Sequence, residues 1–202
     1  MFLHINIPLK TIELMTLIYQ AISQMISVSE TEYELFMEKS FVRLLAKNEI
    51  ITQPGVIPNE IFFINKGLIR VMINDHKGVD HTIHFAMENQ FISDYTHFMQ
   101  MQPSIYTLQA LENTEVVVLP RSTIDWGYKN LKEGEKMGRL IAEYYFMYQD
   151  DRIRNTYLRT PKERYESMSS IFPNIHQRVP QHMIASYLGI SPIHLSRVKK
   201  SV

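Results

Sequence analysis

The sequence predicts an α+β fold in which an antiparallel β-roll with flanking helices is followed by a long helix and a small helical domain. Short β-branched and aromatic segments, separated by turn residues, occupy the stretch 41–119. Apolar residues at helical spacing occur before and after that stretch. Residues 152–202 carry nine Lys and Arg against two Glu, a net charge of +7 in a chain that is neutral as a whole. Strands grouped together and followed by helices are typical of α+β proteins.

The N-terminal domain, residues 1–128, is predicted to contain two helices and then the β-roll. Ser29 precedes acidic residues that suit the first turn of the second helix. Turn residues such as Gly, Pro and Asn separate the strands that follow. The predicted strands are 50–51, 61–64, 68–73, 81–85, 105–108 and 116–119. Regular short strands with such turns are typical of an antiparallel barrel or roll.

Residues 129–159 are predicted to form the long connecting helix, with its helical stretch beginning at Glu133. At 1.5 Å per residue it spans roughly 40 Å, more than a small roll needs to cover itself. We therefore expect its apolar face to form a homodimer interface. The alternative is that this face packs on the roll of its own subunit. The residues on that face are Met137, Leu140, Ile141, Tyr144 and Tyr148.

The C-terminal domain, residues 160–202, has the pattern of a helix-turn-helix. Thr160 and Glu163 form a capping box that begins a new helix. Further on, Gly189 suits the left-handed conformation that ends a helix, and Ser191-Pro192 suits the start of the next. The second helix of such a unit can lie in the DNA major groove. Only two residues follow Lys200, so we expect no β-wing.

The last predicted helix carries the candidate DNA contacts, because its free side is basic. An ordinary αα-hairpin in a helical core explains the apolar spacing of this region but not that basic side. A +7 segment attached to an acidic body is also typical of a nucleic-acid-binding domain. The candidate DNA-contacting residues are Ser191, Ile193, His194, Ser196, Arg197 and Lys200.

From about Ser29 to its end, the chain resembles the Crp/Fnr family of bacterial transcription regulators, in the wingless form common in Bacteroidetes-type bacteria. The segments that carry the resemblance are 54–55, 60–64, 66–70, 177–181 and 195–197. The resemblance implies a cyclic-nucleotide-binding-like roll, a homodimer, and a two-fold-symmetric site on double-stranded DNA. It also implies RNA polymerase and a small-molecule effector as further partners. Of the family's base-contacting positions, Pro192, Ile193 and Arg197, the last alone keeps the family's residue type.

The resemblance also places a ligand pocket in the roll, at Ser93, Asp94, Ser104, Ile105 and Tyr106. The family's pocket holds the cyclic phosphate with an Arg, and here the matching residue is Ser104. A buried phosphate would then have no cationic partner, so we expect neither cyclic AMP nor cyclic GMP to bind, and no other cofactor is indicated. An apolar ligand and a filled core both remain open.

Other classes of function find little support in the sequence. The chain contains no cysteine, which excludes disulfides, thiolate metal sites and cysteine nucleophiles. His81 and His84 are an odd number of residues apart, so on a regular strand they face opposite ways, and we expect no metal site. No nucleophile elbow or Gly-rich phosphate loop indicates an enzyme.

We expect a cytoplasmic protein without a membrane partner, because no apolar run reaches the length of a bilayer span. Met15 is an alternative start codon to Met1. The competing interpretation of function is a ligand-binding or protein-interaction module whose helix-turn-helix does not bind DNA.

Overall fold

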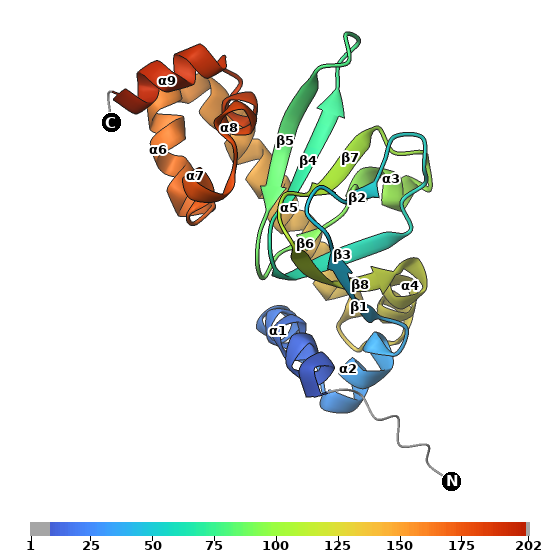
Figure 1. Cartoon of the computed structure of the whole chain (residues 1–202). Helices are drawn as coiled ribbons and strands as arrows, with labels where there is room; N and C mark the ends of the chain where they lie inside the picture. Colours follow the sequence, from blue (N-terminus) through green and yellow to red (C-terminus); the bar gives the residue numbers. More distant parts are fainter. Residues whose placement is uncertain (1–8, 201–202) are drawn as a thin grey trace.

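A computed structural model describes residues 9–200, with side chains from Thr16 onwards, and confirms the predicted α+β class (Figure 1). The two alternative starts, Met1 and the side chain of Met15, lie outside the described residues. Within them, two four-stranded antiparallel sheets form the roll, with strand orders β1-β8-β3-β6 and β2-β7-β4-β5. The strands are β1 (Phe41–Leu45), β2 (Ile50–Thr52), β3 (Glu60–Lys66), β4 (Ile69–Asn74), β5 (Asp80–Ala86), β6 (Phe91–Ile92), β7 (Tyr106–Ala110) and β8 (Thr114–Pro120).

Strands β3 and β8 are buried on both faces, which explains why their sequences are continuously apolar rather than alternating. On one face, Phe62 and Val118 pack inside the roll with residues of the second sheet. On the other face, Phe63 and Val117 pack under helices on the outside of the roll. Successive residues of a strand point to opposite faces, so a doubly covered strand needs apolar residues at every position.

Four helices cover this outer face, and five further helices complete the described chain. The covering helices are α1 (Leu9–Met25), α2 (Glu30–Met37), α4 (Arg121–Asn130) and α5 (Gly134–Leu158). The others are α3 (Tyr95–Gln100), α6 (Pro161–Ile171), α7 (Ile175–Arg178), α8 (Gln181–Leu188) and α9 (Pro192–Lys200). The predicted capping box of Thr160 and Glu163 is present, and Ser29 with Glu32 forms a second reciprocal capping box. The long helix α5 has the bounds that the sequence predicted, to within one residue.

Five elements were not predicted individually, among them helix α4. Strand β1 is half exposed and carries Arg43, so its sequence lacks a regular apolar alternation. Strand β6 is two residues long, and helices α3 and α7 have six and four residues. Elements of one or two turns depend on tertiary contacts for their stability, and their sequences carry little periodic signal.

A β-bulge in β5 changes how two of the histidines are placed. Val71 pairs with His84 and Met72 with Thr82, which leaves Ile83 as an extra residue on β5. Such a bulge interrupts the strict alternation of faces, so the argument that His81 and His84 point opposite ways does not hold. The two rings have different partners: His81 bonds Asp75, and His84 bonds Tyr148.

The turn between α8 and α9 makes a specific demand on Gly189. This residue has φ of 68° and donates its N–H to carbonyls of the last turn of α8. A Cβ there would meet no atom within 4 Å, so the cost of a side chain is purely conformational.

We expect Gly189→Ala to lower the free energy of unfolding by about 1 kcal/mol, because Ala resists the left-handed conformation. Gly189→Asn should cost less, since Asn adopts that conformation more readily. Urea unfolding of the three proteins measures both differences. An Ala variant as stable as the parent would contradict this assignment of the turn.

Candidate DNA-contacting surface and ligand cavity

Helices α8 and α9 pack against each other across the short turn that joins them. Ala185 is completely buried, which permits the close crossing that a larger side chain would prevent. The amide of Ile190 donates to the carbonyl of Ala185 at 3.0 Å and closes the turn. Leu195 and Val198 of α9 are buried, and α9 packs against α8. The inward side of α9 is therefore apolar, and its other side is free.

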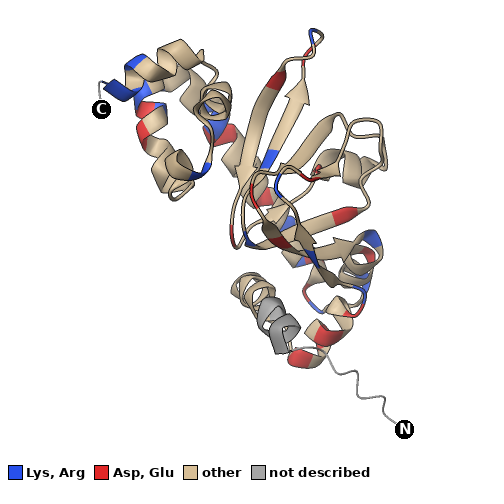
Figure 2. Cartoon of the chain, viewed as in Figure 1, with Lys and Arg blue, Asp and Glu red and all other residues tan. Residues whose placement is uncertain are grey.

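The free side of α9 presents all the candidate DNA-contacting residues to solvent. Ser191, Ile193, His194, Ser196, Arg197 and Lys200 are all exposed. Ile193 has 69% of its surface accessible, although it is apolar. Arg197, Lys199 and Lys200 fall in the last turn, where Figure 2 shows positive charge at the end of α9. Among the described residues, Arg197 and Lys200 form no ion pair, so their charge is available to a ligand.

Four of the arginines that contribute to the +7 charge of the C-terminal segment are engaged in contacts within the protein, however. Arg178 is paired with two glutamates, and Arg154 is paired with Asp150 and Asp151. Arg152 lies over the ring of Tyr187, and Arg164 donates to three backbone carbonyls. The basic surface that remains is therefore concentrated near α9 and is smaller than the net charge indicated.

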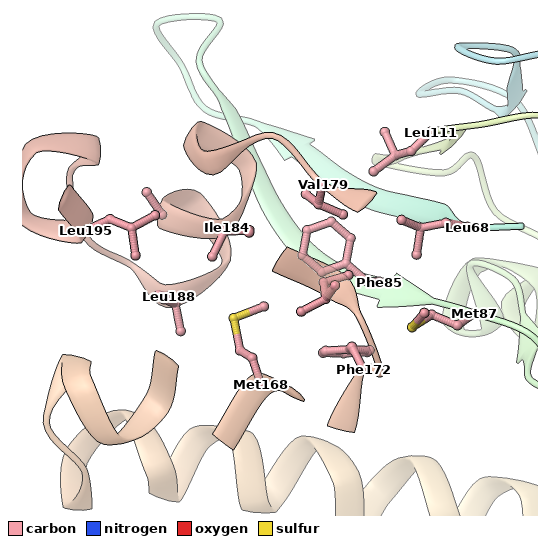
Figure 3. Close-up of a cluster of buried hydrophobic side chains, with 12 residues drawn as sticks. Leu68, Phe85, Met87, Leu111, Met168, Phe172, Val179, Ile184, Leu188 and Leu195 are labelled. Carbon is pink, nitrogen blue, oxygen red and sulfur yellow. The ribbon is translucent and has the colours of Figure 1, made fainter. Parts of the chain in front are cut away.

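One hydrophobic core joins the roll to the C-terminal helices (Figure 3). Leu68, Phe85 and Met87 of the roll lie in the same buried cluster as Phe172 and Ile184 of the helices. Helix α8 packs directly on β5, where the amide of Thr82 donates to Ser186 Oγ at 2.8 Å. Because α8 is held on the roll, the pair of helices α8 and α9 has a defined orientation relative to the roll.

Ion pairs close one edge of this junction. The guanidinium of Arg178 donates to both carboxylate oxygens of Glu88, at 2.8 and 3.0 Å, and to Glu112 at 2.6 Å. The hydrogen bond to Glu88 is the main cause of a raised pKa for Arg178. Glu88 also accepts from the amide of Gly67 at 2.8 Å. A bidentate arginine pair fixes orientation as well as distance, so this contact sets the angle between roll and helices.

Three side chains from three elements meet at the other side of the junction. His84 Nδ1 of β5 lies 2.9 Å from the hydroxyl of Tyr148 on α5. That hydroxyl lies 3.1 Å from the hydroxyl of Tyr187 on α8. Burial, with a smaller effect of Arg152, lowers the pKa of His84 to about 3. The imidazole is therefore neutral at physiological pH, and the chain of hydrogen bonds links roll, long helix and helix-turn-helix.

The residues expected at a dimer interface fall on two sides of α5. Met137 is buried, and Ile141 is half buried, in the core under the outer helices. Tyr148 belongs to the junction with His84, while Leu140 is half buried. Tyr144 is exposed. The remaining exposed apolar residues of α5 are Phe146, Met147, Ile153, Tyr157 and Leu158.

A cavity of about 350 Å³ lies between the roll and α5. Its apolar lining comes from both sides, for example from Val71 and Ile83 of the roll and Ile141 of the helix. Tyr145 closes α5 onto the roll by donating its hydroxyl to the carbonyl of Phe91. Asp94 is the one ionisable carboxylate among the described lining residues, which include no Lys or Arg. The cavity therefore suits a ligand without negative charge.

Most residues at the expected cyclic-nucleotide positions form hydrogen bonds within the protein. Ser104 Oγ donates to Asp94 Oδ2 at 2.6 Å, and the amide of His97 donates to Asp94 Oδ1 at 3.3 Å. Asp94 thus serves as the N-cap of α3. Ser93 Oγ donates to the carbonyl of Glu60, and the amide of Tyr106 donates to Ser104. Ile105 is exposed and does not line the cavity, whereas Ser93, Asp94 and Tyr106 do.

Two further observations bear on site chemistry. Across the described side chains, no three His, Asp or Glu residues come together as a group able to hold a metal ion. Nor does any described helix combine the length and apolar character needed to cross a membrane.

Residues 42–129 match the family model of the cyclic nucleotide-binding domain. No curated protein matches the sequence. The structure is similar to FixK2 from Bradyrhizobium japonicum, with a TM-score of 0.68 and 13% identity over 80% of this chain and 83% of that one. It is also similar to a protein from Eubacterium rectale assigned to the Crp/Fnr family of transcriptional regulators, with a TM-score of 0.67 and 14% identity over 86% and 83%. A third similar structure is the Catabolite Activator Protein of Thermus thermophilus, with a TM-score of 0.54 and 16% identity over 87% and 84%.

These matches establish the fold of the chain: a cyclic-nucleotide-binding jelly roll with flanking helices, as the sequence predicted.

The buried state of His84 predicts how stability depends on pH. The unfolded chain takes up a proton at this residue near pH 6.5, whereas the folded protein does so only near pH 3. Stability is therefore lost as the pH falls below about 6.5, by ~1.4 kcal/mol per pH unit for this group.

We expect His84→Gln to reduce the loss of unfolding free energy between pH 7 and pH 5 by about 2 kcal/mol. Urea unfolding of parent and variant at the two pH values gives this difference. The comparison does not depend on how much unfolding free energy the substitution itself removes at pH 7. Equal losses for the two proteins would show that His84 is not kept neutral by burial.

Proposed function

We propose that the chain is a DNA-binding transcription regulator of the Crp/Fnr type that acts as a homodimer on a two-fold-symmetric site. The observation that carries this proposal is the exposed outer side of α9, whose inner side is buried against α8. Helices in this arrangement insert into the DNA major groove in other helix-turn-helix proteins. The division into roll, long helix and DNA-binding domain at residues 128 and 159 is part of the proposal.

Within this proposal, Arg197 contacts base edges and its neighbours position the helix. Arginine pairs with guanine O6 and N7 through two hydrogen bonds. The exposed Ile193 contacts a thymine methyl group, because an apolar side chain there has no other favourable partner on DNA. Ser191, His194, Ser196 and Lys200 contact phosphates, which fixes the register without specifying sequence.

The exposed apolar residues of α5 support a dimer with α5 at its centre. Leu140, Tyr144 and Met147 follow one another at spacings of four and three residues along one line of the helix, and Leu158 lies eleven residues, about three turns, after Met147. The charged pair Asp151 and Arg154, 3.7 Å apart, continues the same line. Such spacing is that of a two-stranded coiled coil, in which charged core positions specify register.

A dimer of this kind places its two α9 helices on successive turns of DNA. Productive half-sites lie about 34–36 Å apart, so any change at the roll or at α5 that alters this spacing alters affinity. RNA polymerase and a small-molecule effector are the further partners in the proposal, which includes no catalytic activity. Cyclic AMP and cyclic GMP are not the effectors, because Ser104 and Asp94 leave no cation for a phosphate.

A second candidate function is a ligand-binding module whose helix-turn-helix serves protein contacts. It is favoured by the number of arginines of the C-terminal segment that are engaged inside the subunit, such as Arg178 and Arg164. The two candidates differ in their response to salt. DNA binding that weakens steeply as salt increases supports the regulator, and binding to a protein surface does not follow DNA counterion release.

We expect Arg197→Ala to weaken binding to a selected DNA site by ~1–3 kcal/mol while leaving binding to random DNA mostly intact. The site is first obtained by selection from random duplexes, and affinities are then measured by fluorescence anisotropy at fixed salt. Arg139→Ala, an exposed arginine on α5 paired with Glu143, is the control and should change neither affinity. Equal losses on specific and random DNA would contradict a base-contacting role.

We expect Tyr144→Glu combined with Met147→Glu to convert the dimer into monomers, because both side chains are exposed on the side of α5 proposed as the dimer interface. Sedimentation equilibrium measures the change. Leu44→Glu, at an equally exposed position on β1, is the control and should leave the dimer intact. A double variant that sediments as the parent does would place the interface elsewhere.

A further inference from the structure

We propose that the cavity between the roll and α5 binds an uncharged, predominantly apolar small molecule with an aromatic ring, and that this molecule is the signal of the proposed regulator. The inference rests on the proposed function for its role as a signal, but not for the binding itself. It names a class of ligand that differs from cyclic nucleotides in charge.

The size and lining of the cavity define the ligand. Its volume of about 350 Å³ falls within the range of small-molecule sites, which is roughly 300–1,000 Å³. An apolar cavity of about 150 Å³ is enough to admit benzene. Aromatic and branched aliphatic side chains dominate the lining, as in most ligand sites. The volume suits a bicyclic aromatic molecule or one of similar size.

The polar groups at the cavity exclude an anion. The carboxylate of Asp94 accepts hydrogen bonds from Ser104 and from the amide of His97, and the His97 ring lies beside it, with Nδ1 2.9 Å from Oδ1. Its negative charge disfavours a phosphate or carboxylate ligand at this place. His84, which also lines the cavity, is neutral because it is buried. No lining residue in the described part of the chain is a Lys or Arg that would balance a negative charge. An anion in this place would have no cationic side chain as a partner among the described lining residues.

The position of the cavity gives the ligand a route to the helix-turn-helix. His84 and Tyr148 line the cavity, and the hydroxyl of Tyr148 also lies 3.1 Å from that of Tyr187 on α8. The ring of His84 further packs against Phe172, which follows α6. A ligand that displaces either ring therefore acts on the contact by which the roll holds the C-terminal helices.

The test compares two probes that share one aromatic group and differ in charge: 2-naphthol and 2-naphthyl phosphate. Calorimetric titration of the full chain, without DNA, is expected to show one site per subunit for 2-naphthol. It should show binding at least about 100-fold weaker for the phosphate, since burying the anion costs several kcal/mol. Equal affinities, or no binding of 2-naphthol, would overturn the proposal, as would micromolar binding of cyclic AMP.

Variants locate the binding. Ile83→Phe and Ile141→Phe fill the cavity from the roll and from α5, and each should weaken 2-naphthol binding by about tenfold or more. Ile57→Phe enlarges an exposed side chain away from the cavity and should leave the affinity unchanged. Thermal unfolding verifies that each variant is folded. A folded pair of cavity variants with parental affinity would place the ligand elsewhere and overturn the proposal.

The role as a signal is measured separately. Saturating 2-naphthol should change the DNA affinity of the parent by about fivefold or more, and that of Ile83→Phe much less. If the protein binds both 2-naphthol and DNA but its DNA affinity does not change, the role of the cavity as a signal site is overturned. If the chain binds 2-naphthol but no DNA at all, the proposed function fails while the ligand site stands.

Discussion

The buried contact between strand β5 and helix α8 is the constraint on which the positions of the other sites depend. Phe85 and Ile184 lie in one core that belongs to the roll and to the C-terminal helices together. Arg178, held by Glu88 and Glu112, fixes the angle between the two parts. Separating the roll from the C-terminal helices would expose a large part of this shared core. Such exposure is costly, because apolar burial is the main favourable term in folding.

This constraint explains how one chain presents different surfaces at the same time. Helix α8 is used for attachment to the roll, which leaves the outer side of α9 free. One side of α5 covers the roll and the cavity, and its other side keeps exposed apolar residues such as Tyr144. The hydrogen bonds from His84 through Tyr148 to Tyr187 connect all three parts. In the proposed function, these are the sensor, the dimer helix and the DNA-contacting unit.

The sequence predicted the features that depend on local rules, and the structure was needed for those that depend on distant contacts. The cap at Thr160 and the turn at Gly189 follow from neighbouring residues, and both are present. The bulge at Ile83 and the pairing of Arg178 with Glu88 have no local signal, because their partners lie on other elements. The net charge of the C-terminal segment consequently overstated its free basic surface. The resemblance placed part of the cavity at Ser93, Asp94 and Tyr106, whereas the lining residues of α5 could be identified only from tertiary packing.

Native-state hydrogen exchange is the most direct test of the shared core. We expect slowly exchanging amides of α8 and of the central β5 residues, such as Thr82 and Phe85, to open with one common free energy and one common dependence on denaturant. That result would identify a single cooperative unit that spans roll and helix-turn-helix. If the amides of α8 instead exchange through a separate opening of much lower free energy, the helices do not share a core with the roll in solution. The account of how the helix-turn-helix is positioned would then be contradicted.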